Sequence, residues 1–188
     1  MAETLASWTD GAAKRAIVEF VERAVSEVPV EERIATFDND GTLWCEKPLP
    51  IQADFILRRL YEMADADAGL RDRQPWKAAY ERDYAWLGRV MAEHYAGDET
   101  NVRTLLGGIL AAFAGITVDD FEAASDAFLR GVRHPTLGRG YLDCAYTPMV
   151  ELLAYLAANG FTSYIASGGG AISCARSARR CTAFHASV

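Results

Sequence analysis

The sequence predicts an α/β protein in which an all-helical module interrupts a core with parallel strands. Two short apolar runs, at 33–37 and 161–167, each end in polar residues that favour turns. A helical repeat of apolar residues precedes each run, as in the helix–strand units of a parallel sheet. Between the two runs, residues 48–146 repeat apolar side chains at the helical period.

The first helix and strand are expected in the N-terminal part of the chain. Thr9 or Asp10 could cap a helix that Pro29 ends. Its apolar residues recur every three or four positions: Ala13, Ile17, Phe20, Val21, Ala24 and Val25. The run from Arg33 to Phe37 is short and has acidic neighbours, so we expect a buried strand there.

The insert is expected to contain helices alone. Apolar residues at spacings of three and four predict helices over 51–64, 74–95, 101–113 and 117–132. Thr117 is the expected N-cap of the last of these helices, and Asp120 lies in its first turn.

The chain is then expected to return to the core. Thr147 and Pro148 begin a helix that Gly160 closes, and residues 161–167 form a second strand before three glycines, 168–170. In a parallel α/β sheet, the carboxyl ends of the strands line the ligand crevice. Both strands here end in the polar residues that such a crevice requires.

Two aspartates follow the first strand, and their spacing suggests a site. Asp38 and Asp40 point the same way if the chain is extended, so they can share one cavity. Adjacent carboxylates repel and need a cation or a shared proton, and Mg²⁺ prefers such oxygen ligands. Gly41 permits a sharp turn, and Thr42 offers a hydroxyl and an amide.

This arrangement suits phosphoryl chemistry. With Mg²⁺ bound, one aspartate can attack phosphorus and form an acyl-phosphate, while the other protonates the leaving oxygen. Ser167 and the amides of Gly168 and Gly169 can donate to the phosphoryl oxygens. Each motif alone is more often a solvated turn or a loop. Their joint occurrence after two strands favours the catalytic interpretation.

These motifs resemble those of the haloacid dehalogenase-like (HAD) hydrolase superfamily. Residues 37–43, Phe-Asp-Asn-Asp-Gly-Thr-Leu, resemble its first motif, and residues 165–169 resemble its second. The helical insert resembles the cap of phosphoserine-phosphatase-like members. The resemblance implies a Rossmann-like core over 1–46 and 147–188, with the cap over 47–146.

The resemblance also implies roles for individual residues. Asp38 is the expected nucleophile, Asp40 the general acid/base and Ser167 the phosphate ligand. The Asp38 carboxylate and the Asp40 backbone carbonyl are the expected Mg²⁺ ligands. Dehalogenases typically lack the second aspartate, so a small phosphorylated metabolite is the expected substrate, hydrolysed by a Mg²⁺-dependent phosphatase.

The superfamily's later motifs, a lysine and an acidic pair, cannot be assigned, because only residues 168–188 follow Ser167. Permitted codons for 171–185, read two bases later, encode a helix-like stretch and then Gly-Ile-Pro, which resembles the family's continuation. We therefore expect a truncated or frameshifted C-terminus, which sequencing the gene would test. The alternative to an active enzyme is a catalytically impaired HAD-like fragment with weak or absent turnover and possible self-association.

Composition excludes several other classes. The net charge of −7 and the lack of a basic run argue against nucleic-acid binding. No apolar stretch suits a membrane span, and the N-terminus has no signal-peptide pattern, so we expect a cytoplasmic protein. The four cysteines have no metal-ligand spacing, and we expect them to be reduced: Cys45, Cys144, Cys174 and Cys181.

Overall fold

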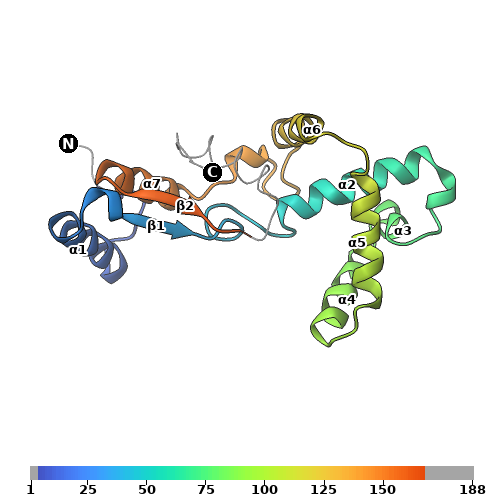
Figure 1. Ribbon diagram of the computed structural model, residues 1–188, viewed down its shortest axis with the longest axis horizontal. Coiled ribbons are helices and arrows are strands. Elements are labelled where there is room, and N and C mark those ends of the chain that lie inside the picture. The colour runs from blue at the N-terminus through green and yellow to red at the C-terminus, as the bar shows by residue number, and fades with distance from the viewer. Residues whose placement is uncertain (1–3, 168–188) are drawn as a thin grey trace. The chain divides into compact units, whose positions relative to one another are not determined.

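The computed structural model describes residues 4–167, which form a mixed α/β structure that is mostly helical (Figure 1). The chain divides into two compact units. The first, here called the core unit, comprises residues 1–50 and 125–188, and the second, the helical unit, comprises Ile51–Ala124. A HAD-type Rossmann core remains a prediction, and so do domain boundaries at residues 47 and 146.

The core unit contains a two-stranded parallel sheet. Strand β1 (Ile34–Phe37) pairs with β2 (Thr162–Ile165) in a register that places Phe37 opposite Ile165. Both predicted strands are therefore confirmed, each slightly shorter than expected. Two helices lie beside the sheet, α1 (Ala12–Glu27) and α7 (Thr147–Ala158) (Figure 1). Short 3-10 turns occur at η1 (Val30–Glu32) and η3 (Tyr141–Asp143).

Both helices contribute to one buried cluster that packs against Ala35 and Phe37 of β1. Its fully buried members come from the two ends of the described chain: Leu5, Val21, Ala24, Leu152, Leu156 and Phe161. Side chains alternate along a strand, so the cluster can cover only one face of each strand. The cluster thus joins α1, α7 and Phe161, which directly precedes β2, to one face of β1.

The expectation of a buried first strand is wrong. Ile34 of β1 is 57% exposed, and Tyr164 of β2 is 42% exposed. The pairing places Ile34 and Tyr164 two positions apart on the sheet face opposite to Ala35 and Phe37. Among the described residues, no helix covers the face that carries Ile34 and Tyr164. The apolar run at 33–37 suggested a strand covered on both faces, but β1 is covered on one face only.

The ends of α1 and α7 show which capping predictions hold. Gly11, with no side chain, is the N-cap of α1, and Asp10 instead pairs with Lys14 Nζ at 3.0 Å. The predicted Thr9 or Asp10 cap is therefore wrong, because the i,i+4 ion pair takes the carboxylate. Gly160 closes α7 as predicted, with a φ of +79° that favours glycine.

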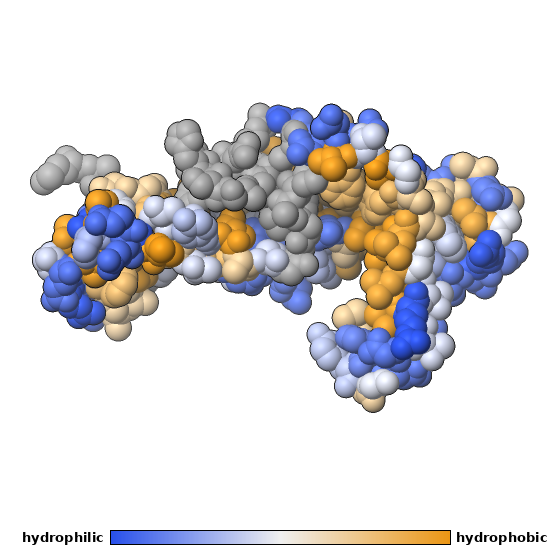
Figure 2. Space-filling view, in the orientation of Figure 1, coloured by the Kyte–Doolittle hydropathy of each residue, from blue (hydrophilic) through white to orange (hydrophobic). Residues whose placement is uncertain are grey.

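The helical unit is built from helices alone, as predicted. They are α2 (Ile51–Ala66), η2 (Ala68–Leu70), α3 (Trp76–Glu81), α4 (Tyr84–Tyr95), α5 (Thr100–Ala112) and the first half of α6 (Val118–Gly131). Two buried clusters join α2, α3, α4 and α5: one contains Leu60, Ala64, Trp76, Ala79 and Ala112, and the other contains Ala78, Trp86 and Val90. Figure 2 shows apolar surface remaining along α5, where Leu110 is 73% exposed.

The single helix expected over 74–95 is two helices, so that expectation is corrected. Arg82 has a left-handed backbone with a φ of +57°, which ends α3. The carboxylate of Asp83 then accepts a hydrogen bond from the Trp86 amide at 2.9 Å and caps α4. The apolar residues keep their helical spacing across Arg82 and Asp83, so spacing alone predicts one continuous helix. A new helix begins after Asp83 because its carboxylate accepts from the Trp86 amide, which has no backbone acceptor at the start of a helix.

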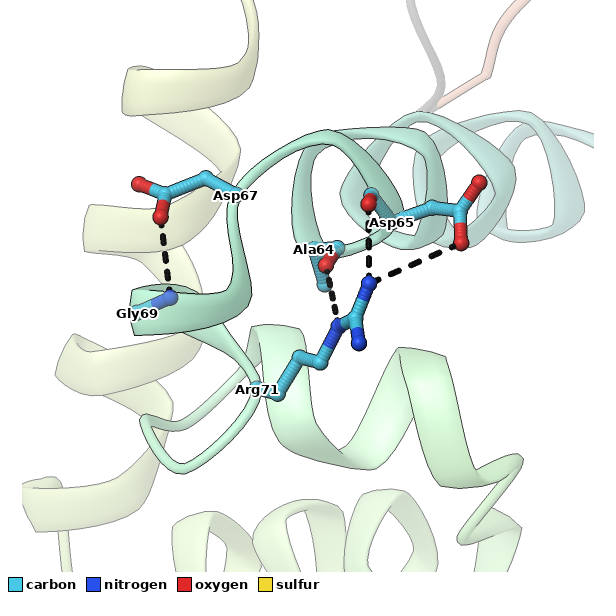
Figure 3. Close-up of polar contacts among 5 residues, drawn as sticks. All are labelled: Ala64, Asp65, Asp67, Gly69 and Arg71. Carbon is cyan, nitrogen blue, oxygen red and sulfur yellow. Dashed lines mark hydrogen bonds and ion pairs between the residues drawn. The ribbon is translucent and has the colours of Figure 1, made fainter.

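Polar side chains close the helix ends within this unit. Arg71 donates to the carbonyls of Ala64 and Asp65, both at 2.9 Å, at the end of α2 (Figure 3). Asp67 accepts from the Gly69 amide at 2.8 Å in the following turn. At α6, Thr117 Oγ1 accepts from the Asp120 amide at 3.1 Å, which confirms the predicted cap.

Candidate active site

The two polar strand ends lie at the same edge of the sheet. Phe37 pairs with Ile165, and the Ala166 amide donates to the Phe37 carbonyl at 2.8 Å just beyond the strands. Asp38 directly follows Phe37, and Ser167 directly follows Ala166. Because the strands are parallel and adjacent, the chain brings the two motifs to neighbouring positions. Ser167 is half-buried, and Gly168 and Gly169 lie outside the described residues.

The first motif forms a tight turn after β1. The amides of Thr42 and Leu43 both donate to the Asn39 carbonyl, at 3.2 and 2.8 Å, and the Gly41 amide donates to the Trp44 carbonyl at 3.0 Å. Gly41 has a φ of +75°, which the turn requires. The Thr42 amide is therefore used within the turn. The Thr42 hydroxyl is the group of this residue that could contact a ligand.

The side chains of this turn differ in exposure. Asn39 is buried, whereas Asp38 is exposed and Asp40 is half-buried. The alternation is that of an extended segment, in which Asp38 and Asp40 point away from Asn39. An exposed carboxylate at Asp38 is accessible to a ligand, and a half-buried carboxylate at Asp40 can be held by neighbouring groups.

Trp44 holds Asp40. The indole Nε1 donates to Asp40 Oδ1 at 2.7 Å, and the tryptophan is only 4% exposed. A buried indole N–H needs an acceptor, and here the acceptor is a site carboxylate. This pair was not predicted from the sequence. Its signal was a tryptophan four residues after the second aspartate, on the far side of a glycine turn.

A third carboxylate lies against the turn. A Cβ atom on Gly41 would lie 3.0 Å from both Cδ and Oε1 of Glu46, so the Glu46 side chain covers the glycine. Lys47 Nζ lies 3.7 Å from Glu46 Oε1. The absence of a side chain at Gly41 therefore serves both the turn and the close approach of this carboxylate.

An antiparallel bridge supports the turn from the other side. The Tyr146 amide donates to the Leu43 carbonyl at 2.9 Å, and the Cys45 amide donates to the Cys144 carbonyl at 3.1 Å. Trp44 therefore lies opposite Ala145. The pKa of the Tyr146 hydroxyl is raised, first by burial and then by Cys45 and Glu46 nearby. The bridge restrains Trp44 and, through it, Asp40.

The donor set of the turn suits a hard cation. The Asp38 carboxylate is exposed, and the Asp40 backbone supplies a carbonyl oxygen. Mg²⁺ uses one or two carboxylates and completes its shell with water and substrate oxygens, so these donors fit it. Within residues 4–167, no three His, Cys, Asp or Glu side chains group together as they do in an all-protein metal site.

Comparisons with known proteins give no family. No family model matches the chain, and a search of the curated proteins finds no match. The resemblance to the HAD superfamily therefore depends on the motifs at 37–43 and 165–169 alone, and membership remains a prediction. Within the part of the chain that the structure describes, no helix combines the length and apolarity needed to cross a membrane.

Proposed function

We propose that this chain is a HAD-like hydrolase, a Mg²⁺-dependent phosphomonoester phosphatase that acts through an aspartyl-phosphate on Asp38. The observation that carries the proposal is the parallel pairing of β1 with β2, in which the Ala166 amide donates to the Phe37 carbonyl at 2.8 Å. This pairing supports a common site for Asp38 and Ser167, because each follows its strand by one or two residues.

Asp38 is the proposed nucleophile because its carboxylate is exposed. A carboxylate oxygen attacks phosphorus, the bond from phosphorus to the leaving oxygen breaks, and the enzyme retains the phosphoryl group as an acyl-phosphate. The Ser167 hydroxyl donates to a phosphoryl oxygen, and the amides of Gly168 and Gly169 are proposed to do the same. The Asp38 carboxylate and the Asp40 backbone carbonyl would hold Mg²⁺, which would neutralise the negative charge that otherwise keeps the carboxylate and the phosphate apart.

Asp40 is the proposed general acid and base. Trp44 Nε1 already donates to Oδ1, so the proton transferred to the leaving oxygen belongs to Oδ2. After the leaving group departs as an alcohol, the Asp40 carboxylate takes a proton from water, which attacks the acyl-phosphate and releases inorganic phosphate. Trp44 fixes the orientation of the carboxylate through both steps.

The test is hydrolysis of p-nitrophenyl phosphate by the full chain, with Mg²⁺ and with a chelator. We expect slow turnover that requires Mg²⁺ and falls by at least about 100-fold in Asp38→Asn, because that change removes the nucleophile. Asp72→Asn is the matched control, since Asp72 is an exposed aspartate of the helical unit. Equal activity in Asp38→Asn and Asp72→Asn would contradict the assignment.

A second candidate is a HAD-like chain with impaired catalysis. It is favoured by one observation: the described residues contain no group of three acidic, histidine or cysteine side chains that would hold the metal without substrate. A folded chain that shows no Mg²⁺-dependent turnover above the Asp38→Asn level would support this candidate over the phosphatase.

A further inference from the structure

Two cysteines lie opposite one another where the chain leaves the sheet and where it returns. The Cys45 amide donates to the Cys144 carbonyl at 3.1 Å, next to the antiparallel bridge between Trp44 and Ala145. Residues opposite one another in an antiparallel pair have Cα atoms about 4.5 to 5.5 Å apart. This lies within the range of Cα separations in protein disulfides, so the backbone has a geometry that suits a crosslink.

Both side chains are thiols in the structure, and each is held weakly. The Cys45 thiol donates to the Lys47 carbonyl at 3.5 Å, and the Cys144 thiol donates to the Gly140 carbonyl at 3.3 Å. A thiol is a weak donor, so breaking these two hydrogen bonds costs little. The bridge between Trp44 and Ala145 already places the two cysteines opposite one another.

We propose that Cys45 and Cys144 form a reversible disulfide when the protein meets a low-molecular-weight disulfide. This inference concerns the bridge and does not depend on the proposed phosphatase activity. Cys45 is the half-buried partner and Cys144 is 3% exposed, so the reaction begins at Cys45. Cys144, next to it and shielded from solvent, is the resolving thiol.

The small disulfide is the oxidant in this thiol–disulfide exchange. The Cys45 thiolate attacks one sulfur of the small molecule, the sulfur–sulfur bond breaks, and one small thiolate leaves and takes up a proton. The Cys144 thiolate then attacks the Cys45 sulfur and expels the second small thiol. Two protein thiols lose two electrons and two protons, and one small disulfide becomes two thiols.

The crosslink closes a covalent loop that contains the whole helical unit. It also joins Cys45, which follows Trp44, to Cys144, which precedes Ala145, so it fixes the bridge that restrains Asp40. Closing a long loop reduces the entropy of the unfolded chain, so the oxidised protein should unfold at a higher temperature than the reduced protein.

The test is to incubate the full chain with oxidised glutathione, block the remaining thiols with N-ethylmaleimide, digest the protein and identify linked peptides by mass spectrometry. We expect a Cys45–Cys144 peptide that dithiothreitol cleaves. The double variant Cys174→Ser/Cys181→Ser is the control and should retain this peptide. Cys144→Ser should lose it and leave Cys45 as a glutathione adduct.

The same reaction in concentrated urea separates native geometry from chance pairing. The linked peptide should be several-fold more abundant in the folded protein than in the unfolded one, because only the folded chain aligns the two residues. Equal abundance in the two states would overturn the proposal. So would recovery of Cys45 from the folded protein only as a glutathione or maleimide adduct.

Discussion

The core unit and the helical unit reach their buried clusters in opposite ways. In the helical unit, the residues that pack around Leu60 all come from within Ile51–Ala124. In the core unit, α1 and β1 must meet α7 and β2, which lie beyond the entire insert. Local contacts close the first cluster, and contacts between distant segments close the second. Sequence periodicity therefore describes the helical unit better than the core unit.

The units also differ in how completely they bury their apolar residues. Leu60 is fully buried, whereas Ile34, the first residue of β1, is 57% exposed. A helix with an apolar stripe needs one neighbour to bury it, whereas a strand with apolar residues on both faces needs two layers. The described residues supply one layer over the sheet.

The largest expected change in stability tests the difference in burial between Leu60 and Ile34. Leu60→Ala should reduce the free energy of unfolding by about 2–5 kcal/mol, because it leaves a cavity in a closed cluster. Ile34→Ala should cost less than about 1 kcal/mol, because it removes a side chain that is already mostly in water. Urea unfolding of both variants measures the two values. A similar loss for both would mean that the open sheet face is covered in solution.

A smaller effect distinguishes two adjacent glycines of α5. A methyl group at Gly108 would clash with the Pro75 ring, whereas one at Gly107 has nothing within 4 Å. Gly108→Ala should therefore destabilise the protein by about 1–3 kcal/mol through overpacking. Gly107→Ala should stabilise it by up to about 1 kcal/mol, because alanine favours a helix. If α5 packs closely on Pro75, thermal unfolding should show a lower midpoint temperature for Gly108→Ala and a higher one for Gly107→Ala than for the unchanged protein.

The break between α3 and α4 predicts an intermediate effect. Asp83→Ala removes the acceptor for the Trp86 amide and should cost about 1 kcal/mol. Asp83→Asn, which keeps an oxygen acceptor, should cost much less, and it provides the matched control. If neither change alters urea unfolding, the cap does not stabilise the start of α4.

In the core unit, one substitution is expected to stabilise the protein. Ser163 of β2 is 6% exposed, and among the described residues its Oγ has no hydrogen-bond partner. Ser163→Ala should raise the free energy of unfolding by about 1 kcal/mol, because it removes a desolvated hydroxyl. Ala35→Ser, on the same sheet face of β1, should lower stability for the same reason. A stability loss in Ser163→Ala would show that the hydroxyl is satisfied.

Most elements were predictable because their signals are local. The helices at 51–66 and 147–158, the Thr117 cap and the Gly160 terminus follow from apolar spacing and from residues next to each helix end. The division of 74–95 was missed, because tryptophan and tyrosine keep helical spacing through the turn at Arg82. Only the Asp83 carboxylate marked the new helix.

The candidate site was predictable in its residue types but not in its supports. Asp38, Asp40 and Ser167 were identified from two motifs that follow strands. The Trp44–Asp40 hydrogen bond and the Glu46 side chain on Gly41 depend on how the turn folds back. Nothing in the linear order shows that Cys45 lies opposite Cys144, since the whole insert separates them.

The sequence by itself determined which segments are helices and strands and which polar residues end the strands, because those choices depend on neighbours within a few positions. The order of helices and strands also predicted that the two strands are parallel. Only the tertiary structure decided that β1 and β2 are adjacent with Phe37 opposite Ile165, and that one sheet face stays open in the described chain. Pairing and burial depend on which distant segments exclude water from one another, and periodicity carries no information about that choice.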